Sequence, residues 1–137
     1  MVADQVVSPN LQSFLAFDLG TKRTGVAYAS RLLGRAQGQS TVVGEGQVFW
    51  QGVNQRIQEW QPDALVVGVP THPDGAPHEM TLRARKFVRQ LQGRYRLPVF
   101  EVDERYSTAE ALSEGVADAD AGAACIILDQ FLRGLSA

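Results

Sequence analysis

The sequence predicts an α/β fold in which a mixed five-stranded sheet is flanked by helices. Two observations lead to this prediction. Short continuous apolar runs end at a charged residue or a turn, which is typical of strands buried on both faces, and segments with helical periodicity lie between them. Three strands come first, and helices then alternate with strands. This order favours a sheet with antiparallel and parallel pairs.

Strands are predicted at residues 14–17, 25–29, 36–43, 64–69 and 98–102. About six residues separate the first two runs, so they are expected to form an antiparallel hairpin. Glycines leave the bounds of the third strand vague. A helix between strands implies a right-handed crossover and parallel pairing for the later strands.

Apolar residues at helical spacing predict the helices. The stripes are Val53, Ile57 and Trp60; Met80, Ala84, Phe87, Val88 and Leu91; and Ala124, Ile127, Leu128 and Phe131 within a last helix at 119–132. A capping-box pattern predicts a further helix that begins at Ser107. Trp50 and Trp60 are expected to pack in the core, and His72 and His78 are expected to lie in a loop.

The length of 137 residues suits one domain. We expect residues 1–11 to form a flexible extension and residues 12–137 a single domain. No apolar run approaches the ~18 residues that span a bilayer. The single cysteine, Cys125, excludes an intrachain disulfide, fits a reducing cytoplasm, and is expected to be a small core residue.

The formal net charge is -2, but the basic residues are unevenly distributed. Between Met80 and Phe100 there is no acid, and the basic residues are Arg83, Arg85, Lys86, Arg89, Arg94 and Arg96. Such a run is most often a solvated helix face. The absence of any compensating acid favours contact with phosphate groups.

Three acids are candidates for chemistry. Asp18 and Glu104 each follow an apolar strand, and these strands run in the same direction, so their ends share one edge of the sheet. Asp120 lies four residues before Ala124 on the apolar stripe of the last helix. Converging carboxylates would suit Mg²⁺ or Mn²⁺, and two such ions could promote phosphodiester hydrolysis. The alternatives are solvent-facing acids and, for Asp120, a structural role at the helix start.

The loop after Asp18 holds Gly20, Thr21, Lys22 and Arg23. Glycine permits close approach of a ligand, and the polar side chains can contact phosphate. An ordinary polar hairpin remains the alternative. Arg105 either pairs with Glu104 or holds a phosphate near it.

These residues together resemble the YqgF/RuvX family of pre-16S rRNA nucleases and Holliday junction resolvase-like proteins. The matching stretches are 14–27, 60–63, 67–70, 74–75, 83–87, 103–108 and 120–131. The patterns D-x-G-T-K-R-x-G and D-E-R-x-S-T are specific as a pair, and the match covers nearly the whole chain from residue 14.

The resemblance implies an RNase H-like fold and metal-dependent hydrolysis of RNA in 16S rRNA maturation, with Mg²⁺ or Mn²⁺. It implies Asp18, Glu104 and Asp120 as catalytic and metal-binding acids, with Asp103 as the alternative to Glu104. The nucleic-acid contacts expected are Thr21, Lys22, Arg23, Arg83, Lys86, Arg105, Ser107 and Thr108. The chain departs from the family pattern in two ways. Related resolvases carry an acid where this chain has Gly68. The segment at residues 114–119 looks shorter than is usual in the family, and it carries acids where basic residues are common.

Three other functions compete with an RNA nuclease. A Holliday junction resolvase acting on structured DNA should be a two-fold dimer. A sugar-kinase or actin-like phosphate module would need a second domain. A non-catalytic RNA-binding assembly factor would not need all three acids. The sequence leaves the oligomeric state open, and it predicts no association with a membrane.

Overall fold

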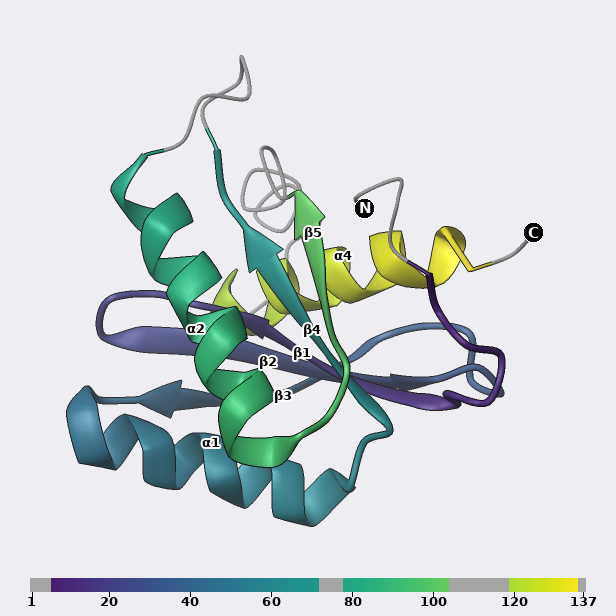
Figure 1. Ribbon diagram of the computed structural model, residues 1–137, viewed down its shortest axis with the longest axis horizontal. Coiled ribbons are helices and arrows are strands. Elements are labelled where there is room, and N and C mark those ends of the chain that lie inside the picture. The colour runs from purple at the N-terminus through teal and green to yellow at the C-terminus, as the bar shows by residue number, and fades with distance from the viewer. Residues whose placement is uncertain (1–5, 72–77, 104–118, 136–137) are drawn as a thin grey trace.

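The computed structural model describes residues 6–71, 78–103 and 119–135, and for residues 119 and 120 it describes the backbone only (Figure 1). The elements are β1 (Ser13–Asp18), β2 (Arg23–Ser30), β3 (Gln37–Val43), α1 (Gly46–Trp60), β4 (Ala64–Val69), α2 (Glu79–Tyr95), β5 (Val99–Asp103) and α4 (Ala119–Arg133). Each corresponds to a predicted element, with bounds that differ by up to two residues for the strands. The helix predicted to begin at Ser107 lies outside the described residues.

The five strands form one sheet in the order β3-β2-β1-β4-β5. β1 pairs antiparallel with β2, as does β2 with β3, whereas the β1–β4 and β4–β5 pairs are parallel. The mixed sheet is therefore confirmed. Because β1, β4 and β5 run in the same direction, all three end at one edge of the sheet, which we call the carboxyl edge.

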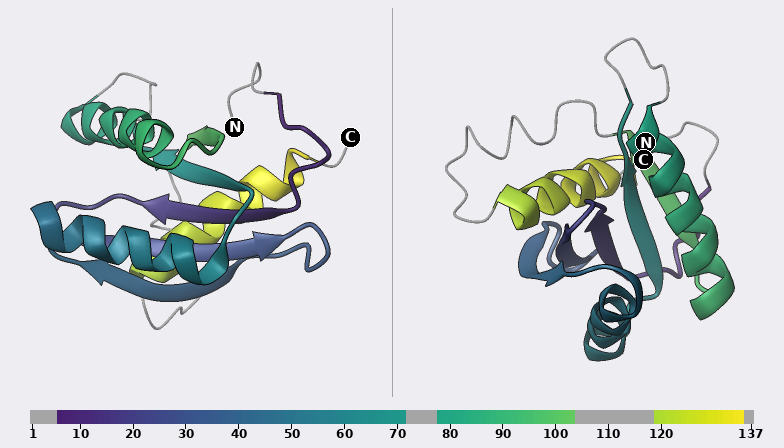
Figure 2. Two further views of the ribbon diagram at one scale, coloured as in Figure 1. Left: turned by 60° about the horizontal axis from the view of Figure 1, so that its bottom comes forward. Right: turned by 90° about the vertical axis from the view of Figure 1, so that its left-hand side faces the viewer.

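Helices cover both faces of this sheet (Figure 2). On one face, α1 contacts β3, and α2 contacts β4 and β5. On the other, α4 lies across the sheet and contacts all five strands. We call these the α1/α2 face and the α4 face. No helix in the described ranges is long and apolar enough to cross a membrane.

Each face has its own apolar core. The α1/α2 face buries large side chains, among them Leu15, Phe17, Phe49, Val53, Leu65, Phe87 and Leu91. The α4 face buries Phe14, Phe100 and Phe131 among alanines and aliphatic side chains that include Ile127 and Leu128. The predicted apolar stripes of α1 and α4 are confirmed, with Trp60 only partly buried at the end of α1.

The start of α2 differs from the prediction in two ways. His78 is the N-cap of the helix: its Nδ1 accepts a hydrogen bond from the Met80 backbone N–H at 3.1 Å. The Thr81 hydroxyl oxygen in turn accepts from the His78 backbone N–H at 3.0 Å and donates to the Pro70 carbonyl. Thr81 is fully buried, whereas Met80, predicted on the apolar stripe, is partly exposed. Thr81 can be buried in place of Met80 because its hydroxyl is hydrogen-bonded and helps to cap the N-terminus of the helix.

The residues before β1 are fastened to the sheet. Arg31 donates through Nε to the Leu11 carbonyl at 2.7 Å and through its Nη2 to the Ser8 carbonyl at 3.2 Å. Val7 and Leu11 pack against the core of the α4 face. The Asp63 carboxylate accepts from the Gln12 and Ser13 backbone N–H groups at 2.7 and 3.2 Å, so it links the chain before β1 to the turn before β4.

Candidate active site

Asp18 is the last residue of β1 and lies at the carboxyl edge. Successive side chains of a strand point to opposite faces. Phe14 and Ala16 belong to the core of the α4 face, and Leu15 and Phe17 to that of the α1/α2 face. The alternation therefore places Asp18 on the α4 face, where it is partly buried.

The register of the parallel strands places Gly68 beside Asp18. Phe17 of β1 pairs with Val67 of β4, so the next residues, Asp18 and Gly68, come level. Gly68 in turn pairs with Val102 of β5. Gly68 is buried and has no side chain, so β4 contributes no functional group to the α4 face at this level. This is the position at which related resolvases were expected to carry an acid.

Asp103 does not join Asp18. Phe100 and Val102 belong to the core of the α4 face, so alternation directs Asp103 to the α1/α2 face. Its side chain is exposed, and its Oδ1 lies 3.5 Å from the Thr71 hydroxyl, which donates to it. Alternation along β5 therefore places Asp103, the alternative ligand considered from the sequence, on the face opposite to Asp18, and the choice between Asp103 and Glu104 stays a prediction. Glu104 itself is outside the described residues.

The backbone of Asp120 lies in the first turn of α4. A Cβ placed on Gly38 would come 3.2 Å from the Ala121 Cβ, so this turn lies close against β3. Gly38 pairs with Ala27, and Ala27 with Ala16, two residues before Asp18. Ala124, four residues after Asp120, is fully buried, as the predicted stripe requires.

These acids do not form a complete metal site within the described part of the chain. No three His, Cys, Asp or Glu side chains in that part come together in a way that could hold a metal ion. Only Asp18 of the three predicted acids has a described side chain. The prediction of a three-carboxylate site therefore stays a prediction.

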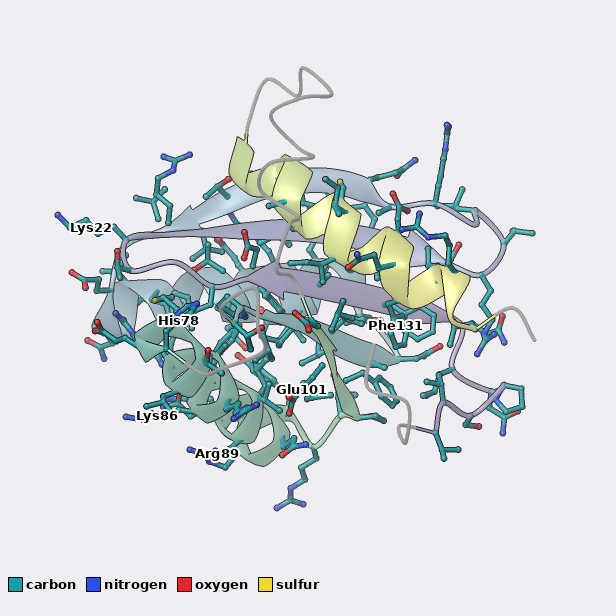
Figure 3. All side chains as sticks on the ribbon, turned by 90° about the horizontal axis from the view of Figure 1, so that it is seen from above. Lys22, His78, Lys86, Arg89, Glu101 and Phe131 are labelled. Atoms are coloured by element: carbon teal, nitrogen blue, oxygen red, sulfur yellow. The ribbon has the colours of Figure 1, made fainter. Side chains whose placement is uncertain are left out.

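The loop after Asp18 forms one wall of a groove of about 210 Å³, which we call the hairpin groove. Its lining residues are Leu19, Gly20, Thr21, Gly44, Glu45, Gly46, Phe49 and Arg83. The groove thus brings Thr21 and Arg83, two predicted nucleic-acid contacts far apart in the sequence, to one place. Figure 3 shows Lys22 at the hairpin tip on the same side of the molecule as His78 at the start of α2.

Close backbone packing builds the hairpin groove. A Cβ on Gly20 would lie 2.1 Å from the Arg23 carbonyl oxygen, so only glycine fits this turn. The Gly44 N–H donates to the Lys22 carbonyl at 2.9 Å and fixes the start of α1 against the hairpin. Gly44 has a φ of +118°, which glycine adopts far more readily than other residues.

The basic residues of α2 lie on the outside of the α1/α2 face. Arg83, Lys86 and Arg89 are exposed, and Figure 3 shows Lys86 and Arg89 pointing away from the helix into solvent. Arg23, at the first position of β2, is also exposed. The predicted contacts Arg105, Ser107 and Thr108 fall outside the described residues. Arg83, which lines the hairpin groove, and Arg23 at the start of β2 therefore lie near the carboxyl edge, where phosphate groups could approach Asp18.

Comparison with known proteins agrees with the fold and the motifs. The model of the RuvX family, described as Holliday junction resolvase, matches residues 12–134. The chain belongs to the RuvX family. The resemblance drawn from the sequence motifs is confirmed.

Two relatives illustrate how close the RuvX family members are. A protein of Albidiferax ferrireducens is 64% identical over 129 residues, which are 94% of this chain and 83% of the relative. A protein of Paraburkholderia phytofirmans is 53% identical, over 90% of each chain. Both bear the name "Putative pre-16S rRNA nuclease".

A solved structure places this RuvX-family chain among RNase H-like folds. T. thermophilus RuvC in complex with Holliday junction substrate matches with a TM-score of 0.55 at 15% identity, over 90% of this chain and 94% of RuvC. At this identity the likeness shows the fold alone. The predicted RNase H-like fold is therefore confirmed.

Three features of the RuvX-family site were missed at the level of sequence. His78 and Thr81 fix the start of α2, and their three-residue spacing before a helical stripe could have indicated a cap. Gly44 and Gly46 shape the hairpin groove; Gly44 directly follows β3 and Gly46 begins α1. Trp50 stacks with Arg94 of α2, and no local pattern indicates contact between residues so far apart.

Proposed function

We propose that this RuvX-family chain is a nuclease that hydrolyses phosphodiester bonds of RNA, with the precursor of 16S rRNA as its substrate. We further propose that residues 12–137 act as one nuclease domain in the cytoplasm, and that a divalent cation is required. The family membership and the shared name of relatives up to 64% identical support the reaction and the substrate.

The observation that carries the proposal is the place of Asp18. It ends a fully apolar strand at the carboxyl edge, lies partly buried on the α4 face, and stands level with a glycine of β4. An acid at the end of an apolar strand is costly unless its charge is compensated, and a bound divalent cation is one way to compensate it. Ligands of open α/β sheets collect at this edge.

The donor set fits a hard divalent cation. All three proposed ligands are carboxylates, which suit Mg²⁺ or Mn²⁺, and no thiol competes because Cys125 lies half-buried farther along α4. We propose Asp18, Glu104 and Asp120 as the ligands. Glu104 is preferred to Asp103 because alternation along β5 directs Asp103 to the other face. A cation held there would supply an activated water and charge stabilisation for the leaving oxygen.

The chain's own cations would bind and orient the RNA backbone. Thr21 and Arg83 meet in the hairpin groove, and Lys22 and Arg23 belong to the same hairpin. Lys86 extends the basic surface along α2. We propose that these residues hold phosphates beside the scissile bond, together with Arg105, Ser107 and Thr108. Such contacts position the strand without reading its sequence.

The test compares substrates, cations and one variant. Purified protein is incubated with single-stranded RNA, single-stranded DNA and a four-way DNA junction, with Mn²⁺, with Mg²⁺ and with EDTA. We expect RNA cleavage that requires the cation. Asp18→Asn should lower the rate by more than the roughly 10- to 100-fold typical of losing an outer-shell partner of a metal ligand.

The matched control is Asp129→Asn, which removes a carboxylate at the opposite end of the sheet. Asp129 accepts a hydrogen bond from the Ala36 N–H at 2.8 Å, and an asparagine oxygen can still accept it. This variant should cleave at the unaltered rate. Equal cleavage by Asp18→Asn and the unaltered protein would contradict the assignment of Asp18.

A second candidate, the junction resolvase, is favoured because the RuvX family is described as Holliday junction resolvase. It predicts cleavage of the junction in preference to RNA, and a two-fold dimer in solution because two strands must be cut symmetrically. Binding of RNA without cleavage of any substrate would instead support a non-catalytic assembly factor.

A further inference from the structure

A second groove, of about 420 Å³, lies between α1 and α2; we call it the α1–α2 groove. Its lining residues are Gln47, Trp50, Gln51 and Asn54 of α1 and Arg94 and Tyr95 of α2. None of the residues assigned to the proposed reaction belongs to it. Its chemistry differs from that of the hairpin groove, because it combines one cation with an indole ring and three amides.

A stacked pair forms the base of this groove. The Arg94 guanidinium carbon lies 3.8 Å from the centroid of the Trp50 ring, which is the distance of a close cation–π contact. Trp50 is itself fixed by aromatic contacts with Phe49 and Phe87, at centroid distances of 5.3 and 5.7 Å. The flat guanidinium is therefore backed by a rigid ring, and Arg94 as a whole is exposed. Arginine planes held in this way are platforms on which nucleic-acid bases stack.

The α1 wall carries uncharged hydrogen-bonding groups. Gln47, Gln51 and Asn54 are spaced at i, i+4 and i+7, so they form one stripe, and all three are exposed. Each amide offers donors and an acceptor, which suits the mixed edge of a base better than the uniform acceptors of a phosphate. Burial raises the pKa of the Tyr95 phenol, partly offset by Arg94, so Tyr95 remains a hydrogen-bond donor.

The α1–α2 groove adjoins the hairpin groove. Gly46 and Phe49 line the hairpin groove, and the residues that follow each of them, Gln47 and Trp50, line the α1–α2 groove. The helix α2 contributes Arg83 to one groove and Arg94 to the other. Aromatic or arginine platforms along a basic track are the usual arrangement of single-strand binding surfaces.

We propose that the α1–α2 groove binds one unpaired base of the RNA substrate, stacked on the Arg94–Trp50 pair with its edge against the amides of α1. The phosphates on one side of this base continue into the hairpin groove toward Asp18. This inference rests on the proposed RNA substrate, and it adds a subsite that requires a single-stranded nucleotide at a fixed distance from the cut.

The first test measures RNA binding by fluorescence anisotropy in an Asp18→Asn background, where no cleavage intervenes. Arg94→Lys keeps the positive charge but removes the planar guanidinium group. It should therefore weaken the binding of a single-stranded oligonucleotide by about tenfold, which is the effect of losing one stacked base. Arg89→Ala, which removes a charge from the same helix outside the groove, is the matched control and should have a smaller effect. Thermal unfolding followed by circular dichroism checks that Arg94→Lys remains folded.

The second test changes the RNA instead of the protein, so it does not depend on the folding of a variant. An abasic site is moved through the oligonucleotide one position at a time. One position should lower the affinity for the Asp18→Asn protein by about tenfold and have no effect once Arg94→Lys is added. In a Trp60→Phe background the fluorescence of Trp50, then the only tryptophan, should be quenched by the intact oligonucleotide and not by the abasic one.

The outcomes separate this inference from the proposed function. If the unaltered protein cleaves RNA while no abasic position and no Arg94 substitution changes affinity, the base subsite is wrong and the nuclease assignment stands. If Arg94→Lys binds as tightly as the parent, the groove offers charge alone and the proposal is overturned. If the protein neither binds nor cleaves RNA, both proposals fail.

Discussion

The two faces of the sheet differ in how they are filled. The α4 face buries the alanines Ala16, Ala27, Ala29, Ala64 and Ala124 together with three phenylalanines. The α1/α2 face buries mostly leucine, valine and phenylalanine. Small side chains let α4 come close: a Cβ placed on Gly38 would lie 3.2 Å from the Ala121 Cβ. One helix therefore covers the α4 face and brings an acidic first turn close to the sheet.

The faces also differ in charge near the carboxyl edge. Alternation places Asp18 on the α4 face, whereas the basic residues of α2 lie on the α1/α2 face. Asp18 and the basic residues of α2 thus lie on opposite faces of the sheet. A phosphate chain that crosses the edge would meet cations on one side and the proposed metal-binding carboxylates on the other. Substitutions on the two faces are therefore expected to have different effects on stability, binding and cleavage.

The largest effect is expected from Phe131→Ala on the α4 face. The Phe131 ring lies 5.1 Å from that of Phe14 and 5.4 Å from that of Phe100, and it is fully buried. We expect a loss of about 3–5 kcal/mol in the free energy of unfolding, measured by urea denaturation. Phe87→Ala on the other face should lose a similar amount. At a temperature where both are folded, Phe131→Ala should cleave more slowly, because α4 carries Asp120. Equal cleavage would contradict a catalytic role for α4.

The next effect concerns the turn between β1 and β2, which follows Asp18 and lines the hairpin groove. Gly20→Ala would place a Cβ 2.1 Å from the Arg23 carbonyl, so the hairpin must shift. We expect a loss of about 1–3 kcal/mol in unfolding free energy, together with slower cleavage. Gly93→Ala is the control: its Cβ would meet nothing within 4 Å, and alanine should stabilise α2 by up to about 1 kcal/mol. If Gly20→Ala unfolds at the same temperature as the unaltered protein, the turn is not as tight as described.

The elements could be predicted from the sequence because buried strands are continuous apolar runs and helices repeat every 3.6 residues. For the choice between Asp103 and Glu104, the alternation from Phe100 and Val102 favours Glu104, because it directs Asp103 to the α1/α2 face. The cap by His78 and the burial of Thr81 were not predicted, because apolar periodicity does not register a polar group that is satisfied by hydrogen bonds.

Contacts between helices could not be predicted from the sequence for a different reason. The stacking of Trp50 on Arg94 depends on how α1 and α2 cross, which no local pattern determines. The hairpin groove likewise needs three segments at once, from Leu19, Gly44 and Arg83. Trp50 was expected to be a packing residue only. Its aromatic contacts confirm the packing. Its ring also contacts the Arg94 guanidinium, which was not expected.

A smaller effect is expected from the cations of α2. Arg83→Ala removes a charge that lines the hairpin groove, so it should weaken RNA binding and reduce the slope of log affinity against log salt by about 0.7 for a single strand. Arg85→Ala removes the same charge about 200° around the helix and should leave the slope nearly unchanged. Anisotropy titrations at several salt concentrations measure both. Equal slopes for the two variants would show a diffuse basic surface instead of a groove contact.

The smallest effect concerns Cys125, which lies between α4 and β3; a Cβ placed on Gly38 would be 3.5 Å from its Sγ. Burial, together with the neighbouring Asp129 carboxylate, raises the pKa of its thiol to about 11. The folded protein therefore holds this proton more tightly than the unfolded chain, whose thiol has a pKa of about 8.5. Stability should be constant below pH ~8.5 with respect to this group and fall as the pH rises toward 11. At pH 8, alkylation of the thiol should be roughly a hundredfold slower in the folded protein than in the chain unfolded in urea. Equal rates in the two states would show that α4 does not pack on the sheet as described.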